Sequence, residues 1–195
     1  PDCSLEQMVA IKALAAQIGA AVSGFSDGYI KEGDGDGFLI QDDKASNRAG
    51  LKILAIDTAQ NTFEENLSDA HLLINFNNDL SLFYDQDSLK NLLKDKRVIG
   101  VTSHDTSFTQ MANLTLPAAS YSEYSGSIIS CDKILQTFDK AITNNKDPLD
   151  IGQITSLIGG KLKSSEERFE ALKKVIPLLN DFTPDNIPNS GLQLT

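Results

Sequence analysis

Four side chains near the middle of the chain are of the types used in nucleophilic catalysis. Ser103, His104 and Asp105 are consecutive, and Cys131 offers a second nucleophile further on. A hydrolase needs a base that activates the nucleophile and an acid that orients this base. No Ser or Cys here lies in a nucleophile-elbow motif, and adjacent His and Asp side chains rarely orient each other. We therefore predict that Asp105 or Thr106 caps a short helix instead.

An acidic, glycine-rich stretch carries a second candidate chemistry, the binding of calcium. Counted from its first acidic residue, carboxylates fall at positions 1, 3, 5 and 12 and a glycine at position 6, which is similar to an EF-hand loop. The candidate ligands are Glu32, Asp34, Asp36 and Asp43. Position 9 is Ile40, position 12 is not Glu, and no entering helix is evident. The alternative is an acidic flexible loop without metal.

Composition excludes several other classes of function. The two cysteines, Cys3 and Cys131, cannot hold an iron–sulfur cluster or a structural zinc ion, which need three or four ligands. A net charge of −10 over 195 residues argues against nucleic acid. No apolar run is long enough to cross a membrane, and no signal peptide is present, so we expect a cytoplasmic location. Because the chain starts at Pro1 and enters a helix directly, we expect it to be a piece of a longer protein.

The elements that must position these residues alternate between apolar runs and helical patterns. Ser4 and Gln7 have the spacing of a capping box, and Ser164 or Ser165 is expected to cap a later helix. We predict strands at 51–56, 71–76, 98–102, 114–117 and 127–130, and helices at 4–22, 82–94, 108–112, 149–162 and 166–179.

Strands joined through helices indicate an α/β fold with a Rossmann-like, mainly parallel sheet and helices on both faces. Ligands of such sheets bind at the carboxyl ends of the strands. These ends are predicted at Asp57, at Asn75 to Asn78 and at Thr102 to Asp105. We expect a helix and acidic loop over residues 1–45, an α/β domain over 46–182 and a loose tail over 183–195.

Residues 112–136, ANLTLPAASYSEYSGSIISCDKILQ, carry a family resemblance. The run resembles the third domain of molybdopterin oxidoreductases, and most of all the large iron–sulfur subunit of bacterial NADH:quinone oxidoreductase, respiratory complex I. The matching residues are Ala112, Leu116, Pro117, Ala118, Ala119, Glu123, Gly126 and Gln136. Weaker matches follow in the last two predicted helices, at Pro148, Asp150, Ile154, Gly159, Ser165, Glu167, Phe169 and Leu172.

The sequence departs from the family where relatives approach the pterin nucleotide. Lys133-Ile134 replaces a Gly-Arg pair, and Asn75 stands where relatives have a glycine whose backbone passes close to the nucleotide. The resemblance therefore implies an eroded cofactor site and no catalysis by this chain. The residues of that site would be Asp57, Asn75, Asn77, His104, Asp105, Glu123, Gly126 and Gln136.

The resemblance also implies the surroundings of the domain. The parent subunit would carry 4Fe-4S and 2Fe-2S clusters upstream and contact other subunits of the hydrophilic arm of complex I, on the cytoplasmic side of the inner membrane. One alternative is the cofactor-binding domain of an active molybdoenzyme, of the formate dehydrogenase or nitrate reductase type, with molybdopterin guanine dinucleotide. A second alternative is an acidic, calcium-linked binding module.

Overall fold

The computed structural model describes residues 3–24, 35–36, 38–40, 42–43, 45–143, 146, 148–161 and 163–194. The helices are α1 (Leu5–Ile18), α2 (Arg48–Ile53), α3 (Gln60–Ser68), α4 (Gln86–Leu92), α5 (Ile151–Ile158) and α6 (Ser165–Lys173). Short 3-10 helices are η1 (Leu80–Leu82), η2 (Thr109–Met111), η3 (Pro177–Leu179) and η4 (Pro184–Asn186). The strands are β1 (Leu72–Phe76), β2 (Arg97–Thr102), β3 (Leu114–Pro117), β4 (Gly126–Ile129), β5 (Ile134–Phe138) and β6 (Leu192–Gln193).

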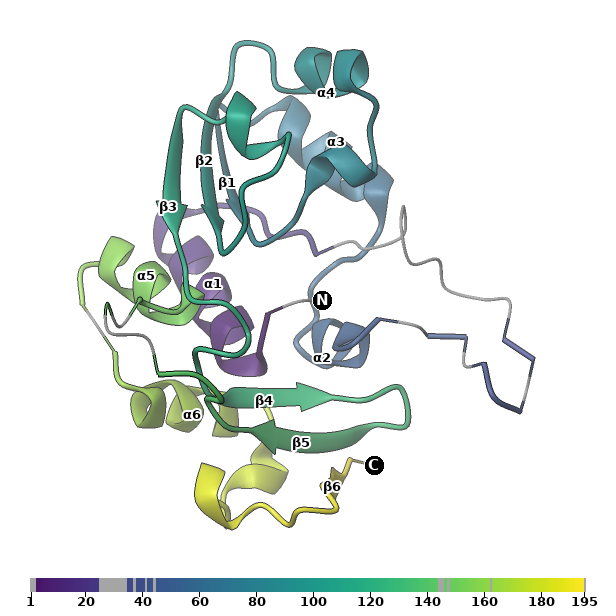
Figure 1. Cartoon of the computed structure of the whole chain (residues 1–195), viewed down its shortest axis with the longest axis vertical. Coiled ribbons are helices and arrows are strands. Elements are labelled where there is room, and N and C mark those ends of the chain that lie inside the picture. The colour runs from purple at the N-terminus through teal and green to yellow at the C-terminus, as the bar shows by residue number, and fades with distance from the viewer. Residues whose placement is uncertain are drawn as a thin grey trace.

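Strands β1, β2 and β3 form a parallel sheet in sequence order, so the protein has an α/β fold (Figure 1). One face carries Leu73 and Val98, which pack in a cluster with side chains from α3 and α4. Side chains on the opposite face, among them Ile74 and Val101, belong to the core that also contains α1, α5 and α6. Both faces of this sheet are therefore covered, as predicted for a Rossmann-like arrangement.

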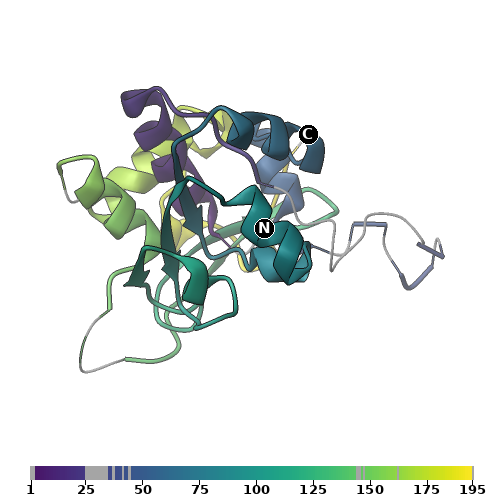
Figure 2. The same cartoon turned by 90° about the horizontal axis from the view of Figure 1, so that it is seen from above.

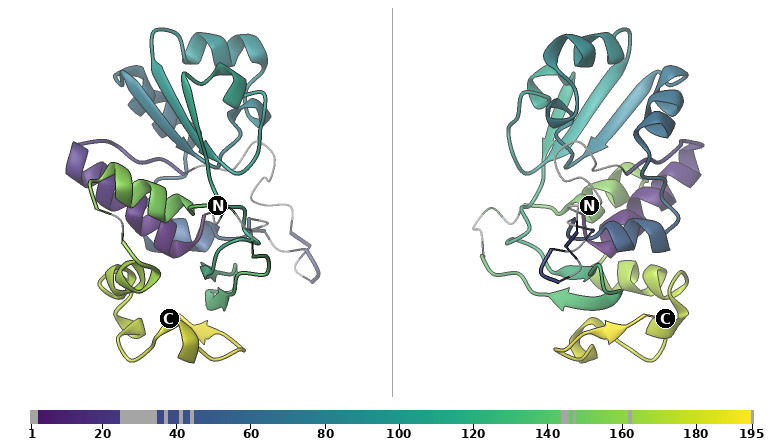
Figure 3. Two further views of the ribbon diagram at one scale, coloured as in Figure 1. Left: turned by 60° about the vertical axis from the view of Figure 1, so that its left-hand side comes forward. Right: turned by 90° about the vertical axis from the view of Figure 1, so that its right-hand side faces the viewer.

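A second sheet, of the antiparallel strands β4, β5 and β6, lies at the other end of the molecule (Figures 1 and 3). The prediction of a mainly parallel sheet is therefore incomplete, since half of the named strands are antiparallel. The tail predicted to be loose over 183–195 is held to the fold in its described part: β6 pairs with β5, and Ile187 and Leu194 are buried in the core.

The predicted strand at 51–56 is wrong, because the structure places a helix, α2, at Arg48–Ile53. Leu51 and Leu54 are buried and lie three residues apart, which is a helical spacing, whereas Lys52 is exposed. The helix ends in a Schellman motif, in which the Ile56 amide donates to the Leu51 carbonyl and the Ala55 amide to that of Lys52. Ala55 there adopts a left-handed φ of 50°.

The predicted helix starts are confirmed where capping chemistry was visible. The Ser4 hydroxyl accepts from the Gln7 amide, and the Gln7 side chain accepts from the Ser4 amide. Ser164 makes the same reciprocal pair with Glu167 at the start of α6. The helix predicted over 166–179 is interrupted, however: α6 ends at Lys173 and Pro177 begins η3.

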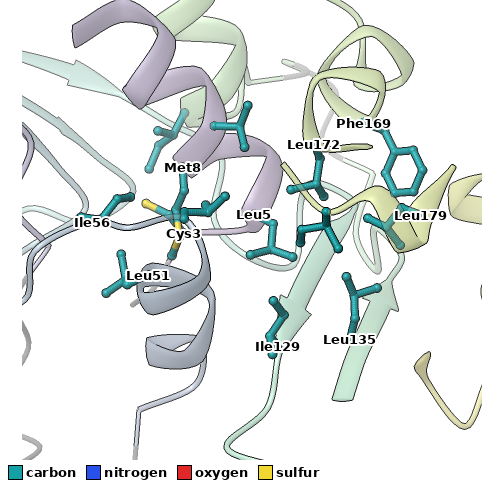
Figure 4. Close-up of a cluster of buried hydrophobic side chains, with 14 of the residues drawn as sticks. Cys3, Leu5, Met8, Leu51, Ile56, Ile129, Leu135, Phe169, Leu172 and Leu179 are labelled. Atoms are coloured by element: carbon teal, nitrogen blue, oxygen red, sulfur yellow. The ribbon is translucent and has the colours of Figure 1, made fainter. Parts of the chain in front are cut away.

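The main core lies where the first turn of α1 meets the second sheet and α6 (Figure 4). Leu5 is fully buried and lies near Ile129 of β4 and Leu172 of α6. Each buried aliphatic side chain contributes about 1.5–3 kcal/mol to the free energy of folding. Cys3 and Leu5 are thus part of the same core as Leu194, near the other end of the described chain.

Candidate functional site

The carboxyl ends of β1 and β2 come together, as predicted for neighbouring parallel strands. The Asn77 Oδ1 atom accepts hydrogen bonds from the Ser103 hydroxyl (3.2 Å), and at 3.4 Å from the Thr102 hydroxyl and the Ser103 amide. The backbone amide of Asn77 donates to the backbone carbonyl of Val101 (2.8 Å), which extends the pairing of the two strands. This edge therefore carries a connected set of amide and hydroxyl groups.

The turn that follows β1 is closed by its own side chains. Asn77 adopts a left-handed φ of 50°, which Asn tolerates better than most residues. The buried Asn75 side chain donates to the Asn78 carbonyl (2.6 Å). The side chain of Asn75 thus occupies the inside of this turn and binds a group of the turn itself.

The Ser-His-Asp residues do not form a catalytic relay. The Ser103 hydroxyl lies 2.8 Å from His104 Nδ1, on an exposed turn. Asp105 instead accepts a hydrogen bond from the Thr109 hydroxyl (2.6 Å), at the start of η2. Cys131 lies outside this edge, in the turn between β4 and β5. The bond of Asp105 is to a side chain, so it does not cap the helix; η2 begins after Phe108 without a side-chain cap. Of the two residues predicted to cap, it is Thr106 whose hydroxyl accepts from a backbone amide, that of Thr109 (3.3 Å).

Three further candidates lie apart from this edge, on or near the second sheet. Glu123 accepts from the Ser120 amide (2.9 Å) and closes the turn that follows the LPAA motif. Gly126 packs against the start of α1: a Cβ atom added to it would lie 2.7 Å from the Ser4 Cβ atom. Gln136 is exposed on β5, opposite Ile128.

Asp57, the remaining candidate, follows α2 rather than a strand. Its carboxylate accepts from the Ala59 amide (2.8 Å), immediately before α3. Its carbonyl accepts from the Gly24 amide, next to a single parallel bridge with Ser23. Asp57 therefore joins the segment after α1 to the start of α3, the helix that precedes the parallel sheet.

Two of the four proposed calcium ligands lie in the described part of the loop, and both bind protein groups. Asp36 Oδ1 accepts from the amides of residues 38, 39 and 40, each at 2.8 Å. Asp43 Oδ1 accepts from the Ala45 amide and from the Arg48 guanidinium (3.2 Å). Glu32 and Asp34 lie outside the described residues. No group of three or more acidic, His or Cys side chains within the described ranges is placed to hold a metal ion.

A buried polar network surrounds the first turn of α1, and sequence reasoning missed it. The Glu6 carboxylate accepts from the Ser127 amide (3.0 Å) and hydroxyl (2.5 Å) on β4. The fully buried Asn47 side chain donates to the Cys3 carbonyl and accepts from the Ile129 amide, both at 2.9 Å. The two residues that each bond joins are between 44 and 121 positions apart in the sequence. Local sequence patterns therefore contain no signal for these bonds.

A second buried polar cluster joins α5 and α6. Arg168 of α6 forms a buried ion pair with Asp150 (2.8 Å), and Asp150 also caps α5 by accepting from the Gln153 amide. Burial is the main cause that raises the pKa of the Tyr124 phenol above its ordinary value, and the electrostatic interaction with Cys3 is the next largest cause. The capping box of Asp150 and Gln153 has a local sequence signature, whereas the pairing of Asp150 with Arg168 has none.

The chain matches no protein-family model, and it matches no curated protein sequence. No helix among the described residues is both long and apolar enough to cross a bilayer.

Proposed function

We propose that this chain is a non-catalytic structural domain of an electron-transfer subunit of NADH:quinone oxidoreductase, derived from the third domain of a molybdopterin oxidoreductase. The observation that carries the proposal is the internal use of the motif residues. Asn75 and Asn77 bind groups of their own turn or of the adjacent strand, and Glu123 binds the Ser120 amide. Gly126 allows β4 to approach α1.

The fold supports the same proposal. A parallel sheet covered on both faces is the scaffold that the resemblance implies, and the LPAA motif leads out of its third strand. Ala118 and Ala119, the two alanines of the motif, are buried, and Ala119 donates to the Leu149 carbonyl just before α5. The motif thus serves to dock the helical end of the chain onto the sheet.

In the proposed setting, the chain supports neighbouring subunits of the hydrophilic arm, on the cytoplasmic side of the inner membrane. The 4Fe-4S and 2Fe-2S clusters of the parent subunit would lie outside this chain. The rival function is that of an active molybdoenzyme, in which this domain holds part of a molybdopterin guanine dinucleotide.

The test is the molybdenum, tungsten and iron content of the full-length parent, purified from its native host. A known molybdoenzyme purified in parallel from the same cells controls for loss of cofactor. Several iron atoms per chain without molybdenum, tungsten or pterin is the expected result. About one molybdenum or tungsten atom per chain would overturn the proposal, because the turn at residues 75–78 would then have to hold a cofactor.

A further inference from the structure

Within the described residues of the turn, 35–36, 38–40 and 42–43, three consecutive large apolar side chains are exposed. Phe38 is 83% exposed, Leu39 79% and Ile40 50%. The described part of this turn lies away from both sheets in two perpendicular views (Figures 1 and 2). Contiguous exposed apolar side chains mark interaction sites in soluble proteins. We name these three residues the apolar tip.

The tip is held in shape by one carboxylate. Asp36 Oδ1 accepts from all three amides of the tip at 2.8 Å, and the Asp36 amide donates to the Ile40 carbonyl (3.1 Å). Asp42 Oδ1 accepts from the Gly35 amide (3.0 Å) and so ties the two arms of the turn together. A turn already held in its binding shape loses less conformational entropy when it docks.

The charge beside the tip restricts what can cover it. Hydrogen bonds from the tip amides, that of Ile40 first, lower the pKa of Asp36, so its carboxylate is ionised at neutral pH. Asp42 adds a second exposed carboxylate. A second copy of the chain brings another net charge of −10, and an anionic bilayer also repels these groups. The complementary surface is apolar at its centre and positively charged at its border.

We propose that the apolar tip docks into an apolar recess bordered by Lys and Arg side chains on a different polypeptide of the same assembly. This inference rests on the proposed function, because that function requires neighbouring subunits. The inference goes beyond the proposed function because it assigns the contact to Phe38, Leu39 and Ile40 and states the chemistry of the partner surface.

The first experiment introduces substitutions into the tagged, full-length parent in its native host. Phe38→Ser/Leu39→Ser removes most of the tip, and Leu82→Ser/Leu178→Ser is the matched control, since both leucines are about half exposed elsewhere. The readout is the fraction of tagged chain that migrates with NADH dehydrogenase activity on a native gel, relative to the total tagged chain in the cells. We expect the tip variant to lower this fraction about tenfold and the control less than about twofold.

Charge is tested in the same assay. Asp42→Asn keeps an oxygen for the Gly35 amide but removes the negative charge, and Asp42→Lys reverses it. We expect both variants to lower the fraction of tagged chain that migrates with NADH dehydrogenase activity, and the lysine variant to lower it more. Added salt should reduce this difference from the wild type, because salt screens exposed charges. Unchanged migration of the tip variant together with the wild type would refute the inference while leaving the proposed function intact.

The second experiment identifies the surface directly. A photoreactive benzoylphenylalanine replaces Phe38, and a second strain carries it at Tyr121, which is 77% exposed and serves as the control. We expect the residue at position 38 to be crosslinked to a different polypeptide, at an apolar peptide that has Lys or Arg nearby. Adducts with a second copy, with the parent chain itself, or no adduct beyond the control contradict the inference. If the wild type does not migrate with NADH dehydrogenase activity, the proposed function fails, and the adduct still tests the tip separately.

Discussion

Gly126 offers a direct test of whether a motif residue serves the fold. It lies in β4, and a Cβ atom there would meet the Ser4 Cβ atom at 2.7 Å and the Ser4 hydroxyl at 3.0 Å. Gly100 lies in β2, where the nearest atom to an added Cβ is 3.8 Å away. Neither glycine has a positive φ. The pair therefore compares the same Gly→Ala change with and without a steric conflict.

The expected magnitudes follow from this difference. Removing a glycine from a strand interior contributes about 0.5–1 kcal/mol in favour of the folded state at both sites. Overpacking at position 126 costs about 1–3 kcal/mol. We therefore expect Gly126→Ala to lower the free energy of unfolding by about 1–2 kcal/mol, and Gly100→Ala to leave it unchanged or slightly raised. The measurement is urea unfolding followed by circular dichroism, with m-values compared among the variants.

A double-mutant cycle identifies the source of the conflict. Ser4→Gly removes the Cβ and hydroxyl groups that the added methyl group at position 126 would meet, and glycine at an N-cap position costs only a few tenths of a kcal/mol. We expect the double variant Ser4→Gly/Gly126→Ala to recover about 1 kcal/mol of the loss. Equal effects at positions 126 and 100, or strictly additive effects in the cycle, would refute the steric explanation and reopen a role for Gly126 in binding.

Three further predictions concern other parts of the fold. Asn47→Ala removes the side chain that binds the Ile129 amide of β4 and the carbonyl of Cys3, two residues before α1, and lowers the free energy of unfolding by about 2–4 kcal/mol; a loss below about 1 kcal/mol contradicts this. Ala55→Gly removes the strain of an alanine in the left-handed conformation and raises the free energy of unfolding by about 1 kcal/mol. A decrease of this free energy, measured by urea titration, argues against the Schellman motif. Burial and a hydrogen bond to Glu64 raise the pKa of Tyr84 to about 12. Because this folded-state pKa exceeds the ordinary value of about 10, the associated stability is present below pH 10 and is lost as the pH rises toward 12. Glu64→Gln should lower the pKa in an ultraviolet titration referenced to Tyr84→Phe, and an unchanged midpoint contradicts the assignment.

The elements predicted correctly from the sequence are those with a local cause. The β-branched run of β2 and the capping serine of α1 decide their own conformation, and both are found as predicted. Leu51 to Ile56 has no such local signal, since its apolar residues fit a strand as well as a short helix. Packing of Leu51 and Leu54 into the core decides in favour of the helix.

The contacts of the candidate site and of the buried polar network also include some that the sequence predicts and some that it does not. The meeting of Asn77 with Ser103 follows from the geometry of parallel strands and was predictable. The contacts of Glu6 and Asn47 depend on which distant strand α1 and α2 pack against. Gly126 was identified from its motif, but its packing against Ser4 required the three-dimensional structure.

The two core clusters also have a consequence for the order of folding. The cluster that covers one face of the parallel sheet draws all its residues from 63–112, a continuous stretch. The other cluster joins Cys3 to Leu194 and is incomplete until the last residues are available. Contacts that are close in sequence form faster than distant ones. During synthesis, residues 63–112 can therefore collapse on their own, whereas α1, which is made earlier, acquires some of its core partners only when residues up to Leu194 have been made.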